Sequence, residues 1–182
     1  RRIFSDRLNR LTGLAVGFGG VWVTTAPTLS FIPDRNGDDV PDREPIAFLD
    51  GWTLEAEHNT VNGLTWGPEG WLYGRHGIKK VSLVGAPGAT KVQRTEVSCG
   101  IWRFHPTRHT FEIVADGTIN PWGLDFDENG QGFASTSVVD HVWHLIPGAR
   151  WERWKNRGGH PDPYTYELMS ATSTHLHWGG GA

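Results

Sequence analysis

The stretch GLTWGPEGWLY, residues 63–73, predicts a β-hairpin. Gly-Leu and an apolar residue lead into the turn Gly-Pro-Glu-Gly, and the strand after the turn carries aromatic side chains. Glycine closes such turns because it adopts a positive φ without steric cost. Two other segments follow the same plan, GLAVGFGGVWV at 13–23 and GLDFDENGQGF at 123–133. Three hairpins of one kind therefore begin at residues 13, 63 and 123, separated by 50 and 60 positions.

Further strand-like segments follow each hairpin. Runs of apolar and β-branched residues predict strands at 28–32 and 45–49, at 100–104 and 110–114, and at 142–146. The first two repeats end in the same Asp-Gly pair. A unit of four antiparallel strands that recurs about every 40–50 residues is typical of one blade of a β-propeller.

We therefore predict an all-β fold, a fragment of about three four-stranded blades from a six- or seven-bladed β-propeller. A ring needs about 4–8 blades, so this chain is expected to be part of a larger ring. The predicted blades within the single partial propeller domain 1–182 are 11–52, 61–117 and 121–170, with the start of another at 174–182. A solenoid and an all-β sandwich are the alternative architectures.

The composition argues against several classes of protein. Hydrophobic residues make up 37% of the 182 residues, too many for a disordered chain. The formal net charge of -3 provides no broad basic face, so no nucleic-acid partner is expected. Cys99 is the only cysteine, so no internal disulfide forms. No run of about 18 apolar residues occurs, so no transmembrane segment is expected in this chain.

The acidic stretch DRNGDDVPD at 34–42 predicts a calcium site. Oxygen donors at alternate positions suit Ca²⁺, which takes about 6–8 hard oxygen ligands. Loop positions 1, 3, 5, 7 and 9 are the side chains of Asp34, Asn36 and Asp38, the carbonyl of Val40, and the side chain of Asp42. The stretch departs from an EF-hand, since Asp39 replaces the glycine of position 6 and Pro45 stands at position 12. We expect a structural calcium, and the alternative is a solvated acidic turn.

Two polar residues precede the first strands of neighbouring blades. His58 lies just before the second blade, and Asn120 lies at the same place before the third. A histidine there suits a general base because its ordinary pKa is close to neutral pH. Asn120 offers both a donor and an acceptor to a ligand, and His76, after the second strand of its blade, is expected to reach the same rim. The alternative is that these residues only form turns.

His175 and His177 form a second candidate pair near the end of the chain. Residues two apart in a strand point to one face, so both rings are placed to bind one metal ion or to line the rim. The alternative is an exposed chain end.

Two motifs carry a resemblance to a known family. The segment from His58 to GLTWGPEGWLY resembles the catalytic-histidine segment of soluble PQQ-dependent sugar dehydrogenases. The segment NPWGLDFDENG at 120–130 resembles their Asn-Pro-x-Gly-Leu segment. Taken as a whole, the chain most resembles a related group, the membrane-bound dehydrogenase-type propellers of planctomycetes and their relatives.

The resemblance implies an oxidoreductase of the glucose/sorbosone dehydrogenase type that lies in the periplasm or elsewhere outside the cytoplasm. Its cofactors would be PQQ and calcium, its substrate a sugar or polyol, and its electron acceptor a fused or partner c-type cytochrome. His58 would be the catalytic base and Asn120 a cofactor contact. His76, from its position after the second strand of the blade, is a further candidate cofactor contact.

The chain departs from the sugar dehydrogenases in two places. The spacing after His58 is one residue longer and lacks their arginine, and residues 135–138 replace a Glu-His-Gly-Pro-like turn. Two other functions therefore stay open: a non-catalytic propeller that binds carbohydrate or protein, and a calcium-dependent lactonase-like hydrolase.

Overall fold

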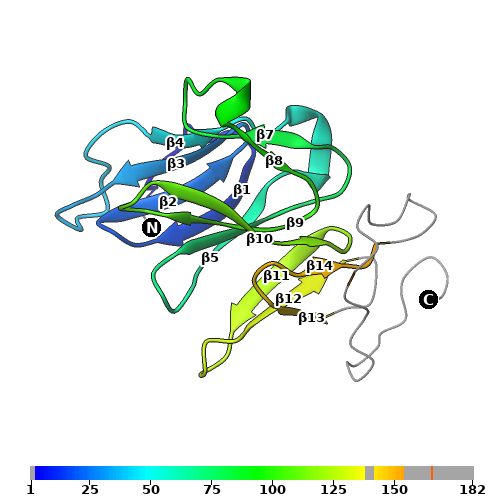
Figure 1. Ribbon diagram of the computed structural model, residues 1–182. Coiled ribbons are helices and arrows are strands. Elements are labelled where there is room, and N and C mark those ends of the chain that lie inside the picture. Colours follow the sequence, from blue (N-terminus) through cyan, green and yellow to red (C-terminus); the bar gives the residue numbers. More distant parts are fainter. Residues whose placement is uncertain (1–2, 138–141, 154–164, 166–182) are drawn as a thin grey trace.

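The computed structural model describes residues 3–137, 142–153 and 165, which form a chain of β-sheets (Figure 1). The first sheet is an antiparallel meander in which each strand pairs with the next along the chain. Its strands are β1 (Leu11–Val16), β2 (Gly20–Thr25), β3 (Thr28–Pro33) and β4 (Ile46–Asp50). A four-stranded meander of this kind is a propeller blade.

The second sheet repeats this plan and gains one strand. Its four antiparallel strands are β5 (Asn62–Trp66), β6 (Leu72–His76), β9 (Gly100–His105) and β10 (Thr110–Gly117). The short strand β14 (Arg150–Trp151) pairs in parallel with the outer edge of β10. This pairing was not predicted from the sequence.

The third sheet has three strands in the part of the chain that the structure describes. They are β11 (Pro121–Phe126), β12 (Gly132–Thr136) and β13 (Val142–Leu145), again in antiparallel order. In Figure 1 this sheet and the first sheet lie on opposite sides of the second. The predicted all-β propeller fragment is confirmed, whereas the number of blades in the ring stays a prediction.

The first strands of the three sheets lie next to one another, as the inner strands of a propeller do. Thr12 on β1 donates to the carbonyl of Val61 at 2.6 Å, just before β5. Thr65 on β5 donates to the carbonyl of Leu124 on β11 at 3.3 Å. Each of these strands also has a register shift near its start, at the Gly-Leu of the repeat. Such β-bulges bend a strand and are common next to functional sites.

A small hairpin is inserted between β6 and β9, where the sequence predicted no structure. Its strands are β7 (Ser82–Val84) and β8 (Thr95–Val97), joined across the 3-10 helix η2 (Lys91–Gln93). Arg94 fastens the hairpin to the first sheet through an ion pair with Asp50. The backbones of Asp50 and Gly85 add two hydrogen bonds, at 2.9 and 3.1 Å.

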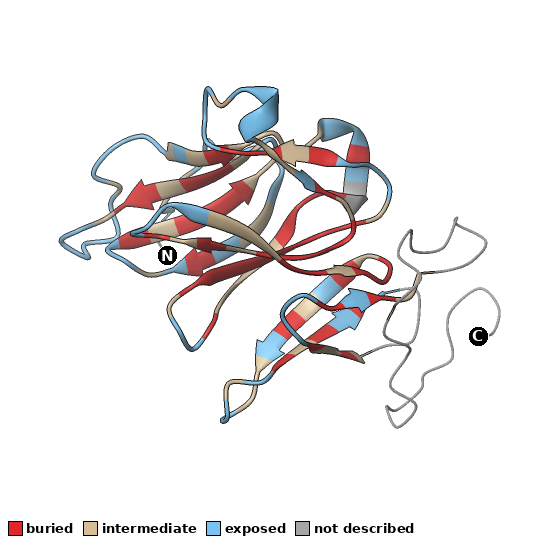
Figure 2. Cartoon of the chain, viewed as in Figure 1, coloured by how far each residue is buried: buried red, intermediate tan, exposed pale blue. Residues whose placement is uncertain are grey.

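Two hydrophobic cores lie between the sheets, where buried residues gather in Figure 2. One core, between the first and second sheets, is built around Trp22, Trp52 and Trp102. The other, between the second and third, contains Trp143 and Trp151. All five indoles are at most 2% exposed, so these large side chains fill the space between the sheets. Within the described residues, no helix is long and apolar enough to cross a membrane.

Candidate functional site

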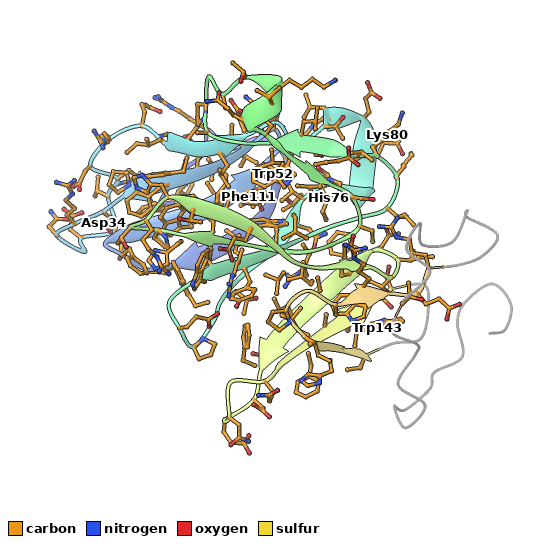
Figure 3. The ribbon with its side chains drawn as sticks, viewed as in Figure 1. Asp34, Trp52, His76, Lys80, Phe111 and Trp143 are labelled. Carbon is orange, nitrogen blue, oxygen red and sulfur yellow. The ribbon has the colours of Figure 1, made fainter. Side chains whose placement is uncertain are left out.

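Three segments meet at the end of the molecule where β5 and β11 begin. They are the 3-10 helix η1 (Leu54–Asn59), the loop 77–81 after β6, and the turn 118–120 before β11. We call this surface the site rim. Figure 3 shows His76 and Lys80 on this side of the molecule, near η1.

Side-chain bonds hold the site rim together. Asn120 Oδ1 accepts the backbone N–H of Ile78 at 3.0 Å, so the turn of the third sheet is tied to the loop of the second. Lys79 pairs with Glu57, and the Lys80 Nζ lies 3.1 Å from the Glu55 carboxylate. These two ion pairs fasten the same loop to η1, which carries His58. The structure therefore brings together the three chain segments on which the sequence placed His58, His76 and Asn120.

Asn120 has a left-handed backbone, with φ 48. Asparagine tolerates this conformation better than most residues, which explains its place in the turn. Its carbonyl oxygen is used by Ile78. Within the described part of the chain, its Nδ2 has no protein partner and is left as a donor. That a cofactor takes this bond stays a prediction.

His76 lies at the end of β6 with no exposed surface. Its Nδ1 lies 2.7 Å from the carbonyl of Gly77, which can only accept, so Nδ1 carries the proton. Its Nε2 then accepts from the Ser82 hydroxyl at 2.9 Å, and Ser82 in turn accepts the backbone N–H of Thr53 at 3.0 Å. Both ring nitrogens are engaged, so His76 links the loop 77–81, β7 and the start of η1. Direct cofactor contact by His76 stays a prediction.

Burial of the His76 ring lowers its pKa from the ordinary value. The unfolded chain therefore takes up a proton as the pH falls through about 6.5, whereas the folded chain does not. We expect the free energy of unfolding to hold above that pH and to fall below it. In His76→Gln, the contribution of this histidine to the decrease in the free energy of unfolding between neutral pH and pH about 5 should disappear. Urea unfolding at several pH values across this range measures the effect. His144→Gln controls for loss of a histidine elsewhere, and an unchanged pH slope in His76→Gln would contradict the assignment.

His58 belongs to η1, which has a kink at Glu57, where φ is 51. The side chain of His58 lies outside the described part of the structure, as do His175 and His177. A depression of about 340 Å³ lies beside η1 and is large enough for a small ligand. It is lined by Arg10, Thr12, Ala26, Leu54, Glu57 and Thr60.

The predicted calcium loop connects β3 to β4, at the opposite end of β3 from the site rim. Asp34 accepts two backbone N–H groups, those of Asp38 and Asp39, each at 3.2 Å. Asp42 accepts the N–H of Arg35 at 3.0 Å, and Asp38 accepts that of Val40 at 2.9 Å. The side chains of the loop therefore turn inward, as a ligand loop requires.

The backbone of Asp39 accounts for the absence of the EF-hand glycine at loop position 6. Its φ is 62, so an aspartate adopts the left-handed backbone for which an EF-hand uses glycine. Within residues 3–137 and 142–153, however, no group of three or more His, Cys, Asp or Glu side chains is arranged to hold a metal ion. Calcium therefore stays a proposal.

Comparison with known proteins identifies the family. The sequence profile of the family described as Domain of unknown function (DUF7133) matches residues 1–173. The chain belongs to this family. No curated protein shows detectable similarity to it.

Two solved structures are similar to this DUF7133 chain, each at 14% sequence identity and a TM-score of 0.42. One is a protein from Thermus thermophilus described as an oxidoreductase (glucose dehydrogenase), for which the match covers 89% of this chain and 70% of that chain. The other is the PQQ-bound form of an aldose sugar dehydrogenase from Streptomyces coelicolor, with 82% and 64% covered.

Two residues that flank the loop 77–81 of the site rim were not predicted from the sequence. Ser82 starts a three-residue strand that has no periodic pattern. Arg75 lies within β6, whose five residues are all buried. A charged residue inside such a strand is itself a signal, because arginine is seldom buried unless it is paired.

Proposed function

We propose that this DUF7133 chain is part of a propeller dehydrogenase that acts outside the cytoplasm and oxidises a sugar or polyol with a bound quinone, PQQ. One observation carries the proposal. The segment that bears His58 and the turn that bears Asn120 are fastened to the same loop, 77–81, by two ion pairs and one hydrogen bond. The two motifs that resemble sugar dehydrogenases thus meet on one rim. A c-type cytochrome, fused or separate, is the proposed electron acceptor.

The residues of the site rim fit such a cofactor at Asn120, whose Nδ2 is left to donate within the described residues. PQQ held by Asn120 would supply a hydride acceptor for the carbinol carbon of the substrate. His58 takes the proton of the substrate hydroxyl, a task that suits a side chain with an ordinary pKa of about 6.5. His76 and Ser82 hold the loop 77–81 in place, and the depression beside η1 is the proposed place of the substrate.

The test is dye reduction by the full-length protein reconstituted with PQQ and calcium. We expect an artificial electron acceptor to be reduced when aldoses or polyols are added, and no reduction when PQQ is left out. Failure to bind PQQ together with no reduction across a broad sugar panel would favour a non-catalytic binding propeller. Opening of a lactone ring without PQQ would favour a hydrolase instead.

We also propose that Ca²⁺ binds the loop 34–42 and stabilises the first blade. The proposed ligands are the side chains of Asp34, Asn36, Asp38 and Asp42 and the carbonyl of Val40. Its support is the inward-turned loop and the left-handed Asp39. The loop lies away from the site rim, so this calcium would be structural.

Calcium is expected to raise the melting temperature of the full-length protein. At a concentration about a hundred times the dissociation constant, binding contributes about 2.7 kcal/mol, or roughly 5–10 °C for a domain of this size. Asp38→Ala should abolish the rise, whereas Glu128→Gln, in an exposed turn of the third sheet, should keep it. Differential scanning calorimetry with calcium or EDTA measures the effect. An equal rise in the parent and in Asp38→Ala would place the calcium elsewhere.

A further inference from the structure

Arg75 is a buried cation near the end of β6, with 7% of its surface exposed. Its Nε donates to Asn62 Oδ1 on β5 at 3.3 Å, and Asn62 donates in turn to the carbonyl of Thr60 at 3.2 Å. Its Nη1 is buried and has no hydrogen-bond partner in the part of the chain that the structure describes. The Arg75 guanidinium therefore donates to an amide oxygen, and no carboxylate pairs with it in the described part of the chain.

Other arginines of the same region are paired. Arg94 meets the carboxylate of Asp50 on the first sheet. Arg103, on the neighbouring strand β9, lies 2.7 Å from Glu112 and 3.3 Å from Glu69. The partly exposed Arg94 and Arg103 thus each have a carboxylate partner. Arg75, the most buried of the three arginines, has no carboxylate partner among the described residues.

The backbone of β5 makes room for the guanidinium. A Cβ placed on Gly63 would lie 1.4 Å from Arg75 Nη2 and 2.2 Å from Cζ, so only glycine fits there. Gly63 is also the bulge residue of β5, with φ 56, and a Cβ on Gly13 of β1 would lie 2.8 Å from its carbonyl carbon. The positive charge therefore lies against the inner strand of the second blade, where the inner strand of the first blade meets it.

Arg75 pairs with Asn62, the first residue of β5, so the charge lies where the inner strand of the second sheet begins. Two hydroxyls of the rim, Thr60 Oγ1 before β5 and Thr118 Oγ1 before β11, are also buried without a hydrogen-bond partner among the described residues. Three unsatisfied groups with donor capacity thus occur where the inner strands of the second and third sheets begin. Donors without acceptors are what an anion-binding position requires.

The cost of this arrangement argues that it is retained for a ligand. Burying a charge without a counter-charge is strongly unfavourable, because the charge loses its hydration and gains no partner. Burial lowers the pKa of Arg75 to about 10, so the guanidinium is still charged at neutral pH. A neutral, apolar residue would remove that cost.

We propose that Arg75 binds a carboxylate group of a small organic anion at the inner-strand side of the site rim. The planar guanidinium matches a carboxylate with two parallel hydrogen bonds, and this match favours a carboxylate over chloride. The unsatisfied hydroxyls of Thr60 and Thr118, which precede the inner strands of the second and third sheets, are further candidate donors. The inference does not depend on the proposed oxidation, because it concerns binding alone. A sugar acid and a planar aromatic acid are the two sources that would present this chemistry.

The experiment is calorimetric titration of the full-length protein with sodium gluconate and, separately, with sodium benzene-1,3-dicarboxylate, with calcium in excess and chloride at equal ionic strength as reference. We expect at least one of the two to bind and chloride to give no response. Gluconate binding alone indicates a sugar acid, and dicarboxylate binding alone indicates a planar ligand. No binding of either acid to the parent protein would overturn the proposal.

Variants separate this role from a structural one. Arg75→Met should weaken binding of the acid by roughly tenfold or more, since it removes a charge-assisted hydrogen bond. Without added acid it should melt at or above the temperature of the parent, because an unpaired buried charge is lost. Arg75→Lys keeps the charge but not the fork and should bind with intermediate affinity. Arg103→Met, which removes a paired arginine from the same sheet, should bind the acid as the parent does.

Two results for the variants would also overturn the proposal. One is an unchanged affinity for the acid in Arg75→Met. The other is a melting temperature of Arg75→Met far below that of the parent in the absence of acid, which would show that the guanidinium is paired and structural. If Arg75→Met does not fold, the affinity of Arg75→Lys for the acid is compared with that of the parent. Equal affinities of the two proteins would contradict the proposal.

Discussion

Replacing Trp102 by alanine is expected to lower the free energy of unfolding by about 3–5 kcal/mol. Trp102 lies on β9 and has no exposed surface. Its ring contacts Trp52 at a centroid distance of 5.3 Å and Phe111 at 5.8 Å, and its Nε1 donates to the carbonyl of Arg75 at 3.2 Å. The substitution would open a cavity between the first two blades and leave that carbonyl without its indole donor.

Urea unfolding followed by circular dichroism measures this loss. Trp122→Ala is the matched control, because Trp122 lies on β11 with 45% of its surface exposed. We expect this control to change the free energy of unfolding by less than about 1 kcal/mol. A loss in Trp102→Ala no larger than in Trp122→Ala would show that the space between the two sheets collapses around the missing ring.

Replacing His58 by alanine is expected to reduce the rate of dye reduction about 10²–10⁴-fold, as for other lost acid–base groups. The expectation rests on the proposed oxidation, in which His58 takes the hydroxyl proton of the substrate. Steady-state kinetics of the reconstituted full-length protein measures it. Since the base acts in the chemical step, kcat should fall more than KM rises.

Two variants check that the loss is chemical. His58→Gln keeps a polar side chain but cannot take up the proton, so it should be about as slow as His58→Ala. His144 lies at the end of the third sheet opposite the site rim, where its ring stacks on Phe133. His144→Ala should therefore keep the rate of the parent. Equal rates in His58→Ala and the parent would remove His58 from the mechanism.

The repeated Gly-Leu hairpins were predictable from sequence because their signals are local. Turn glycines and alternating apolar residues act over fewer than about ten positions, and the predicted pairs of strands correspond to β1–β2, β5–β6 and β11–β12. The register shift at Gly63 is shared by the Gly-Leu of all three inner strands. What the sequence could not show is that the Arg75 guanidinium, from the neighbouring strand, fills the space that a side chain at position 63 would need.

The inserted hairpin and β14 were missed for a different reason. β7 and β8 have three residues each and β14 has two, too few to show a period. They are held by distant partners: Arg94 pairs with Asp50, 44 positions away, and β14 pairs with β10. Contacts across such separations leave no pattern in a single sequence.

The sequence by itself determined that this chain is a propeller fragment with one repeating hairpin, and which polar residues precede its inner strands. Only the tertiary structure decided what those residues do there, because burial and partners depend on where the sheets meet. Asn120 lies in the turn before β11 and accepts a hydrogen bond from the loop after His76, whereas its contact with a cofactor stays a prediction. His76, expected to reach the rim from the end of its strand, is enclosed with both nitrogens bonded, and Arg75 beside it is buried without a carboxylate in the described region. Both outcomes depend on how far each side chain is removed from water between the packed blades. Neither the composition nor the spacing of residues along the sequence determines that burial.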